Sequence, residues 1–187
     1  MNIEQRWNTY IRIVEKAEQS HPGSLSLVKQ LEQRIVECPA GVDSSTSFSE
    51  PGGLVELSLS VTSKMRAINK ALEIGIDDRS IIFTGMFHSI GLVGDEERPY
   101  YIPQDSSWHL QRGIYYKYNE NIPKMPVQHR SLYLIQSSGI KVSYDEWCAI
   151  ATSGGFHRDE SKFYLGSESK LAVLLSQARQ WVLNRSE

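Results

Sequence analysis

Long apolar runs are missing from this sequence of 187 residues. No segment approaches the roughly 20 consecutive apolar residues that a membrane-spanning helix needs. The first ten residues, MNIEQRWNTY, contain no apolar core of a secretory signal. We therefore expect no membrane partner and a location in the cytoplasm.

The sequence also has few cysteines and a small net charge. Two cysteines, Cys38 and Cys148, cannot make a disulfide framework, and they are expected to be small buried residues in a reducing compartment. A net charge of -2 argues against a large basic surface, so duplex nucleic acid is not an expected partner. The 40% of hydrophobic residues is enough for one domain, residues 1–187, with a substantial core.

Apolar residues recur at steps of three and four in most of the chain, which predicts an all-α fold of about seven helices. Residues 1–40 are expected to form a helical pair and residues 44–183 a helical core. Three helix starts have candidate caps: Ser24 or Ser26, Asp77 or Asp78, and Ser143 with Glu146 as a capping box. The predicted helices cover 3–17, 24 to about 37, 53–72, 78–91, 127–138, 144–152 and 167–182.

Two segments lack a helical period. Residues 42–53 are loop-like by composition, and residues 95–126 predict a long ordered loop with a short hairpin and a helical turn near SWHLQRG. This second loop is rich in rings that either pack against the helices or form an interface. They are Tyr100, Tyr101, Trp108, Tyr115, Tyr116 and Tyr118.

Five short motifs follow one another in a recognisable order. They are PGGLVELS (51–58), HSIGL (88–92), HRSL (129–132), AIATSGG (149–155) and LLSQARQW (174–181). This order resembles the HD superfamily of metal-dependent phosphohydrolases, and more narrowly the small HD-type proteins that bacteriophages encode. The resemblance spans residues 44–181, and it implies an HD-like helical bundle whose long loop lies between the second and third motifs.

The same resemblance implies a metal site from which most ligands are missing. It aligns Leu57 with a first histidine, Ser89 with the aspartate of the His-Asp pair, and Ser153 with a later histidine. The final aspartate aligns with Arg179, or with Ser176 after a small register slip, whereas His88 and His129 are kept. Because a protein zinc site normally needs three or four ligands, and because an arginine repels a cation, we expect no cofactor and no catalytic residue.

Histidines leave a second interpretation open. His88, His109 and His129, joined by Asp105 or Asp95, would form a rearranged site for a divalent metal in an active phosphohydrolase. The competing expectation for His88 is a buried neutral imidazole bonded to a backbone carbonyl or to a serine. His21 and His157 lie beside turn residues and are expected to be exposed.

Cations suggest a third use of the same region. Arg112, Lys117, Arg130 and Arg179, with His88, His109 and His129, could hold a nucleotide phosphate without cleaving it, unless the four cations are solvated surface charges. The sequence thus predicts a catalytically degenerate HD-type protein of bacteriophage origin that binds a protein partner or a nucleotide in the host cytoplasm. The alternatives are an active metal-dependent nucleotide phosphohydrolase and a structural subunit of a phage assembly.

Overall fold

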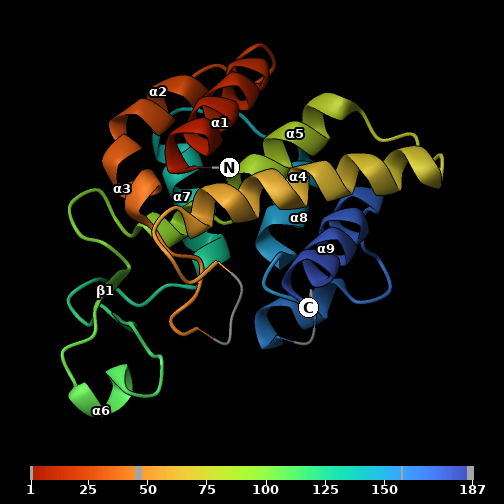
Figure 1. Ribbon diagram of the computed structural model, residues 1–187. Coiled ribbons are helices and arrows are strands. Elements are labelled where there is room, and N and C mark those ends of the chain that lie inside the picture. The colour runs from red at the N-terminus through yellow and green to blue at the C-terminus, as the bar shows by residue number, and fades with distance from the viewer. Residues whose placement is uncertain (1, 45–47, 157, 185–187) are drawn as a thin grey trace.

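The computed structural model describes residues 2–44, 48–156 and 158–184, and within these residues the chain is mostly helical, as predicted. It contains nine α-helices, two 3-10 helices and one two-stranded sheet in these residues (Figure 1). The elements are α1 (Ile3–Glu18), α2 (Ser24–Gln30), α3 (Glu32–Glu37), α4 (Gly53–Ala71), α5 (Asp78–Phe87), η1 (Ile90–Val93), β1 (Tyr101–Pro103), α6 (Ser107–Leu110), β2 (Tyr116–Tyr118), α7 (Val127–Ser137), α8 (Tyr144–Thr152), η2 (Asp159–Tyr164) and α9 (Lys170–Leu183).

The predicted second helix is two helices. The chain leaves helical geometry at Leu31, where φ is -102° and ψ is 9°, and α3 starts at the next residue. No glycine or proline marks this position, so local propensity gives no signal for the break. The predicted serine cap is also wrong, since Gly23 with a φ of 99° precedes α2 and the Ser24 hydroxyl donates to the carbonyl of His21.

Helices α4 and α5 lie at the centre of the bundle. In Figure 1, α4 crosses the middle of the molecule with α5 beside it, α1 to α3 on one side and α8 and α9 on the other. The predicted stripe on α4 is buried from Leu54 to Met65, but Leu72, the residue after the end of α4, is 66% exposed. Helix α5 begins after Asp77, whose carboxylate accepts from the amide of Arg79, which confirms one of the two predicted caps.

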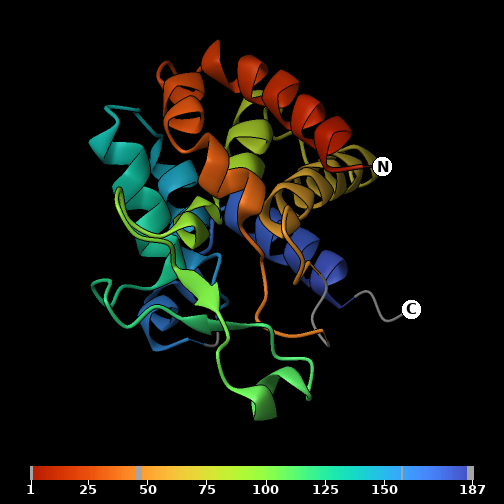
Figure 2. The same ribbon diagram turned by 60° about the vertical axis from the view of Figure 1, so that its left-hand side comes forward.

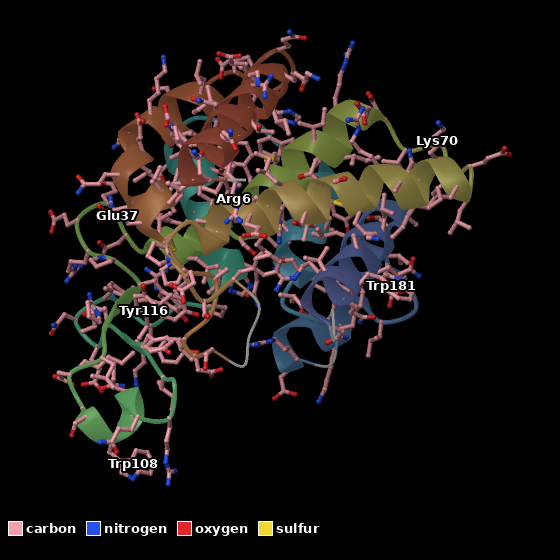
Figure 3. All side chains as sticks on the ribbon, viewed as in Figure 1. Arg6, Glu37, Lys70, Trp108, Tyr116 and Trp181 are labelled. Atoms are coloured by element: carbon pink, nitrogen blue, oxygen red, sulfur yellow. The ribbon has the colours of Figure 1, made fainter. Side chains whose placement is uncertain are left out.

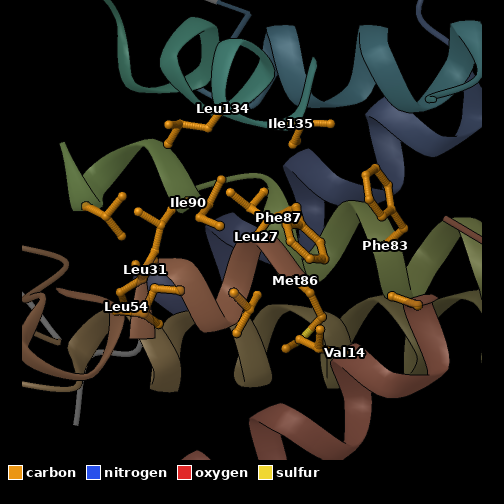
Figure 4. Packing of buried hydrophobic residues seen from close by; sticks show 14 of the residues in the cluster. Val14, Leu27, Leu31, Leu54, Phe83, Met86, Phe87, Ile90, Leu134 and Ile135 are labelled. Atoms are coloured by element: carbon orange, nitrogen blue, oxygen red, sulfur yellow. The ribbon is translucent and has the colours of Figure 1, made fainter. Parts of the chain in front are cut away.

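Buried apolar side chains form two clusters. Figure 4 shows the larger one, in which Phe83, Met86 and Phe87 of α5 lie between α1 and α2 on one side and α7 on the other. The smaller one joins α4 to α9 through residues such as Val61, Met65, Leu171 and Leu175. Cys38 and Cys148 are buried and free, as predicted.

The predicted loop between residues 95 and 126 contains the expected hairpin and helical turn. Strands β1 and β2 pair antiparallel with Tyr101 opposite Tyr118, and α6 lies between them in the chain. Both ribbon views show α6 at the end of an arm that extends from the bundle (Figures 1 and 2). An isolated bridge between Asp43 and Ile114 joins this arm to the segment before α4.

The C-terminal helices follow the predicted signals with one shift. The capping box of Ser143 and Glu146 opens α8, as predicted. Helix α9 begins at Lys170 with Ser169 as its cap, three residues later than predicted, and the short helix η2 precedes it without a sequence signal. Within the described residues, none of the helices has the length and apolar content needed to cross a membrane.

Candidate anion-binding pocket

A cavity of about 280 Å³ lies where the bundle meets the arm. Its wall comes from α4, the end of α5, the start of α7, the ends of α8 and α9, and the tyrosines of the arm. The lining residues are Ala40, Leu57, His88, Ser89, Leu92, Tyr100, Tyr101, Tyr118, Pro126, Val127, Gln128, Ser153, Gly154, Arg158, Arg179 and Leu183.

Five of the six positions that the HD resemblance assigns to metal ligands meet at this one cavity, and the sixth, His129, is not part of the lining. The five are Leu57, His88, Ser89, Ser153 and Arg179. They come from α4, from α5 and the turn after it, from the end of α8 and from α9, so they are far apart in the chain. Ser176, the alternative position for the final aspartate, is not part of the lining.

His88 ends α5 and is fully buried. Its Nδ1 lies 2.8 Å from the carbonyl oxygen of Gly85. A carbonyl oxygen can only accept, so Nδ1 carries the proton and a neutral ring is left with an acceptor at Nε2. This agrees with one of the open expectations for His88, a buried imidazole bonded to a backbone carbonyl. Nε2 has no hydrogen-bond partner among the described residues.

Two effects keep the His88 ring neutral. Burial lowers its pKa, the positive charge of Arg179 lowers it further, and together they outweigh the hydrogen bond to Gly85 and bring the pKa to about 3. At neutral pH this imidazole is therefore a buried acceptor without a donor.

Arg179 supplies a fixed charge to the cavity. Its Nη1 donates to the hydroxyl of Ser89 at 2.8 Å. Burial lowers the pKa of Arg179 to about 10, and the charge of Arg158 acts in the same direction, so the guanidinium remains protonated at neutral pH. No ion pair joins Arg179 to a carboxylate in the described part of the chain.

A second cation and three phenols complete the polar wall. Arg158, which precedes η2, donates from Nε to the carbonyl of Gly154 at 2.9 Å. Tyr100, Tyr101 and Tyr118 come from the arm, where their rings contact one another at centroid distances of 4.9 to 5.5 Å. Burial raises the pKa of Tyr100 and of Tyr101 above the usual range, so these two phenols stay neutral and can donate.

The remaining sequence candidates lie outside the cavity lining. His109 is in α6 against the ring of Trp108, and the guanidinium of Arg112 stacks on the same ring at 3.6 Å. Lys117 forms an ion pair with Asp105 at 2.7 Å. His129, half-buried in the first turn of α7, is also absent from the lining.

Arg130 lies beside the cavity rather than in it. It is 3% exposed, donates from Nη2 to the carbonyl of Pro123 at 2.8 Å, and lies over the ring of Tyr100 at 5.6 Å. It lines a groove of about 740 Å³ that shares Tyr100 and Tyr118 with the cavity. The seven predicted ligand residues therefore separate, and His88 and Arg179 are the two that meet.

The lining does not suit a divalent metal. Among its described side chains it offers one imidazole and no carboxylate, whereas zinc needs three or four ligands and hard cations need several oxygens. Across residues 2–44, 48–156 and 158–184, no group of three His, Cys, Asp or Glu side chains has the proximity to hold an ion. The acidic partners of the predicted rearranged site are engaged elsewhere, with Asp95 bound by Arg98 and Asp105 by Lys117.

Sequence reasoning missed one lining cation and one buried histidine. Arg158 follows a glycine pair in a segment without periodicity, so no pattern pointed to it. His21, expected to be exposed, is buried, stacks on Phe83 at 3.8 Å and bonds to Glu146 at 3.2 Å. His157, the other histidine expected to be exposed, lies outside the described residues.

Comparisons of this chain with protein-family models, with curated proteins and with solved structures give no match.

Proposed function

We propose that this protein is an HD-type binding module that has lost its catalytic metal and holds a phosphate-like anion in the cavity around Arg179. The observation that carries the proposal is the pair of cations, Arg179 and Arg158, in a lining whose described side chains include no carboxylate. The HD relationship and the bacteriophage origin remain predictions from the sequence motifs.

The convergence of five of the six aligned positions supports the HD part of the proposal, whereas the sixth, His129, lies outside the lining. Three of the five motifs, read from sequence order alone, predicted that Leu57, His88, Ser89 and Ser153 share a site, and these residues do line one cavity. The last motif adds Arg179 from α9. Unrelated motif matches would be expected to scatter over the surface.

The charge balance of the cavity supports an anionic ligand. A charge removed from water without a charged partner costs free energy, and the cost grows with the depth of burial. Arg179 is partly buried; among the described residues its side chain has one neutral acceptor, the Ser89 hydroxyl, and its neighbour Arg158 repels it. An oxyanion would remove this cost, and a guanidinium can bind it with two parallel hydrogen bonds.

The rings at the arm support a ligand with a flat group, such as a nucleotide. Tyr100 and Tyr118 belong both to the cavity and to the larger groove beside it. A phosphate in the cavity and a base against these rings would use both spaces, because every base has a face that stacks on an aromatic side chain.

Ligand-induced stabilisation tests the proposal. We would measure the melting temperature with inorganic phosphate and with a panel of nucleoside mono- and triphosphates, for the unaltered protein, Arg179→Gln and the control Arg112→Gln. A ligand at a hundred times its Kd stabilises by about 2.7 kcal/mol. We expect stabilisation of the unaltered protein and of Arg112→Gln, and none of Arg179→Gln. Absence of stabilisation by every anion would refute the proposal.

Hydrolysis is the competing outcome. The same nucleotide panel with manganese, cobalt or magnesium, together with elemental analysis of the purified protein, shows whether phosphate or pyrophosphate is released. Metal-dependent release that His88→Ala abolishes would replace the binding module with a working phosphohydrolase that has a rearranged site.

A structural role has separate support from the arm. Trp108 is 53% exposed at the tip of the arm, away from the bundle (Figure 3), and Leu110 and Tyr115 are exposed close to it in the chain. Exposed aromatic groups of this kind are common in protein interfaces. Sedimentation of the unaltered protein and of Trp108→Ala tests self-association, and a stable assembly without any anion response would favour a structural subunit.

A further inference from the structure

Among the described side chains that line the cavity, His88 differs in its hydrogen-bonding capacity. The arginines can only donate, and the serines, the tyrosines and Gln128 can both donate and accept. His88, held by the Gly85 carbonyl at 2.8 Å, can only accept at its remaining nitrogen while the ring is neutral.

The unpartnered Nε2 makes this difference matter. A buried acceptor without a donor costs about 1–3 kcal/mol, and the described protein atoms offer Nε2 no donor. In an oxyanion that has lost all its protons, the oxygen next to Nε2 would present a lone pair to the lone pair of Nε2, and no hydrogen bond could form between them. An oxyanion with one remaining proton would donate that proton to Nε2 while its other oxygens face Arg179 and Arg158.

We infer that His88 Nε2 makes this pocket select an oxyanion that carries a proton, so that a phosphate monoester is bound in preference to a sulfate ester of the same shape. This inference rests on the proposed anion-binding function and adds the chemical class of the anion. A phosphate monoester can keep one proton, whereas a sulfate monoester has none near neutral pH.

Among the described groups around the cavity, His88 is the one suited to accept the proton of the ligand. The charged or titratable side chains of the lining are Arg179 from α9, Arg158 before η2, and Tyr100, Tyr101 and Tyr118 from the arm, while α4, α7 and α8 contribute Leu57, Gln128 and Ser153. None of the described lining side chains is a carboxylate that could take the proton instead. The low pKa of His88, about 3, agrees with a ring that enters the complex neutral.

The inference predicts that the phosphate monoester takes up a proton when it binds, and this uptake can be measured. The second pKa of a phosphate monoester is about 6, so above pH 7 the free ligand is mainly a dianion. Binding then takes one proton from solvent, and this proton ends between a phosphate oxygen and Nε2. The affinity should fall about tenfold for each pH unit above 7 and level off below 6. A sulfate ester binds with a proton only if His88 itself takes it up, which its low pKa opposes.

Phenyl phosphate and phenyl sulfate form a matched ligand pair for the test. Calorimetric titration of the full chain at pH 5.5, 6.5, 7.5 and 8.5, in two buffers with different ionisation enthalpies, reports both affinity and proton uptake. We expect phenyl sulfate to bind at least about tenfold more weakly at pH 7.5, and phenyl phosphate to take up close to one proton at pH 8.5.

Variants separate the inference from the proposed function. His88→Phe keeps a ring without an acceptor and should bring the two affinities together, and Arg179→Gln should weaken both ligands. If His88→Phe fails to fold, the unaltered protein still decides. Equal binding of both ligands without proton uptake overturns the inference and leaves the anion pocket standing. Binding of neither ligand at any pH overturns both.

Discussion

Arg179 Nη1 donates to Ser89 Oγ at 2.8 Å and so joins α9 to the turn that follows α5. The two residues are 90 positions apart, and the HD resemblance assigns both to lost metal ligands. A serine and an arginine thus bond to each other where the resemblance expects two carboxylates around a cation. The positive charge at this place belongs to the protein itself, so under the proposed function the site would take an anion where the resemblance expects a cation.

Loss of the Ser89 hydroxyl should loosen this arrangement without unfolding the chain. In Ser89→Ala, Arg179 loses the side-chain acceptor that it has among the described residues and spends less time in the orientation that meets an anion. We expect the affinity for inorganic phosphate to fall about five- to tenfold, the equivalent of one hydrogen bond, by calorimetric titration. Ser63→Ala on the exposed side of α4 is the control, and an equal loss in that variant would argue against a specific tether.

Removal of the Arg179 charge should stabilise the ligand-free protein. A partly buried guanidinium that has no carboxylate partner among the described residues is a cost to folding, and methionine fills a similar volume without the charge. We expect Arg179→Met to raise the free energy of unfolding by about 0.5–2 kcal/mol in denaturant titrations without phosphate. A destabilised Arg179→Met would indicate that the arginine serves the fold rather than a ligand.

His88 should make the protein sensitive to mild acid. Its pKa is about 3 in the folded state and about 6.5 in the unfolded state, so between these values the unfolded chain binds one more proton. Stability is therefore lost as the pH falls from 6.5 toward 3, by up to about 1.4 kcal/mol per pH unit. Urea titrations between pH 7 and 5 should show a smaller slope for His88→Phe than for the unaltered protein. His129→Gln is the control, and an unchanged slope in His88→Phe would contradict the prediction.

The sequence predicted those parts of the fold that depend on local pattern. The periodic apolar positions of α1 and α4, the Asp77 cap and the Ser143–Glu146 box are set by neighbours within one or two turns, so they can be read without a structure. The break at Leu31 and the exposure of Leu72 depend on what packs against the helix, which periodicity does not contain.

The site was predictable in part for a similar reason. The motif order of the HD resemblance predicted that His88, Ser89 and Arg179 share a site, and these three residues line one cavity. Arg112 and Lys117 are residue types that often bind phosphate. On the arm, however, Arg112 stacks on the ring of Trp108, and Lys117 forms an ion pair with Asp105. Arg158 lines the cavity because of the course that the backbone takes after α8. That segment is irregular, and no residue pattern in the sequence predicts its course.

The buried pair of His21 and Glu146 should stabilise the packing of α8 on the N-terminal helices. Burial acts to raise the pKa of Glu146, but hydrogen bonds from His21, the Ser143 amide and Ser80 outweigh it and lower the pKa to about 2. The ordinary pKa is 4.5, so this contribution is complete above pH 4.5 and is lost as the pH falls toward 2. We expect Glu146→Gln to lower the free energy of unfolding by about 1–3 kcal/mol at pH 7.

Asp145→Asn is the matched control for this pair, because Asp145 lies in the same first turn of α8 but is exposed. Thermal unfolding at pH 7 and pH 4 should show a large loss for Glu146→Gln and a small one for Asp145→Asn. If both variants lose the same stability, the effect belongs to the charge at the start of the helix and not to the bond with His21.

Gly91 should be the least replaceable residue near the cavity, because a side chain there would collide with backbone. A Cβ at this position would lie 2.3 Å from the carbonyl oxygen of Val127 and 2.7 Å from the amide nitrogen of Ser131, both in α7. The Gly91 amide also donates to the Ser131 hydroxyl at 2.9 Å, so η1 cannot move away without breaking that bond. We expect Gly91→Ala to destabilise the protein by about 1–3 kcal/mol and to weaken phosphate binding, because η1 directly follows His88 and Ser89.

Gly75→Ala is the control: its φ of 80° costs about 1–2 kcal/mol in any L residue, yet nothing lies within 4 Å of the added Cβ. Denaturant titration and phosphate calorimetry on both variants should therefore show a stability loss in each but a binding loss in Gly91→Ala alone, and unchanged binding in Gly91→Ala would mean that η1 does not position the pocket.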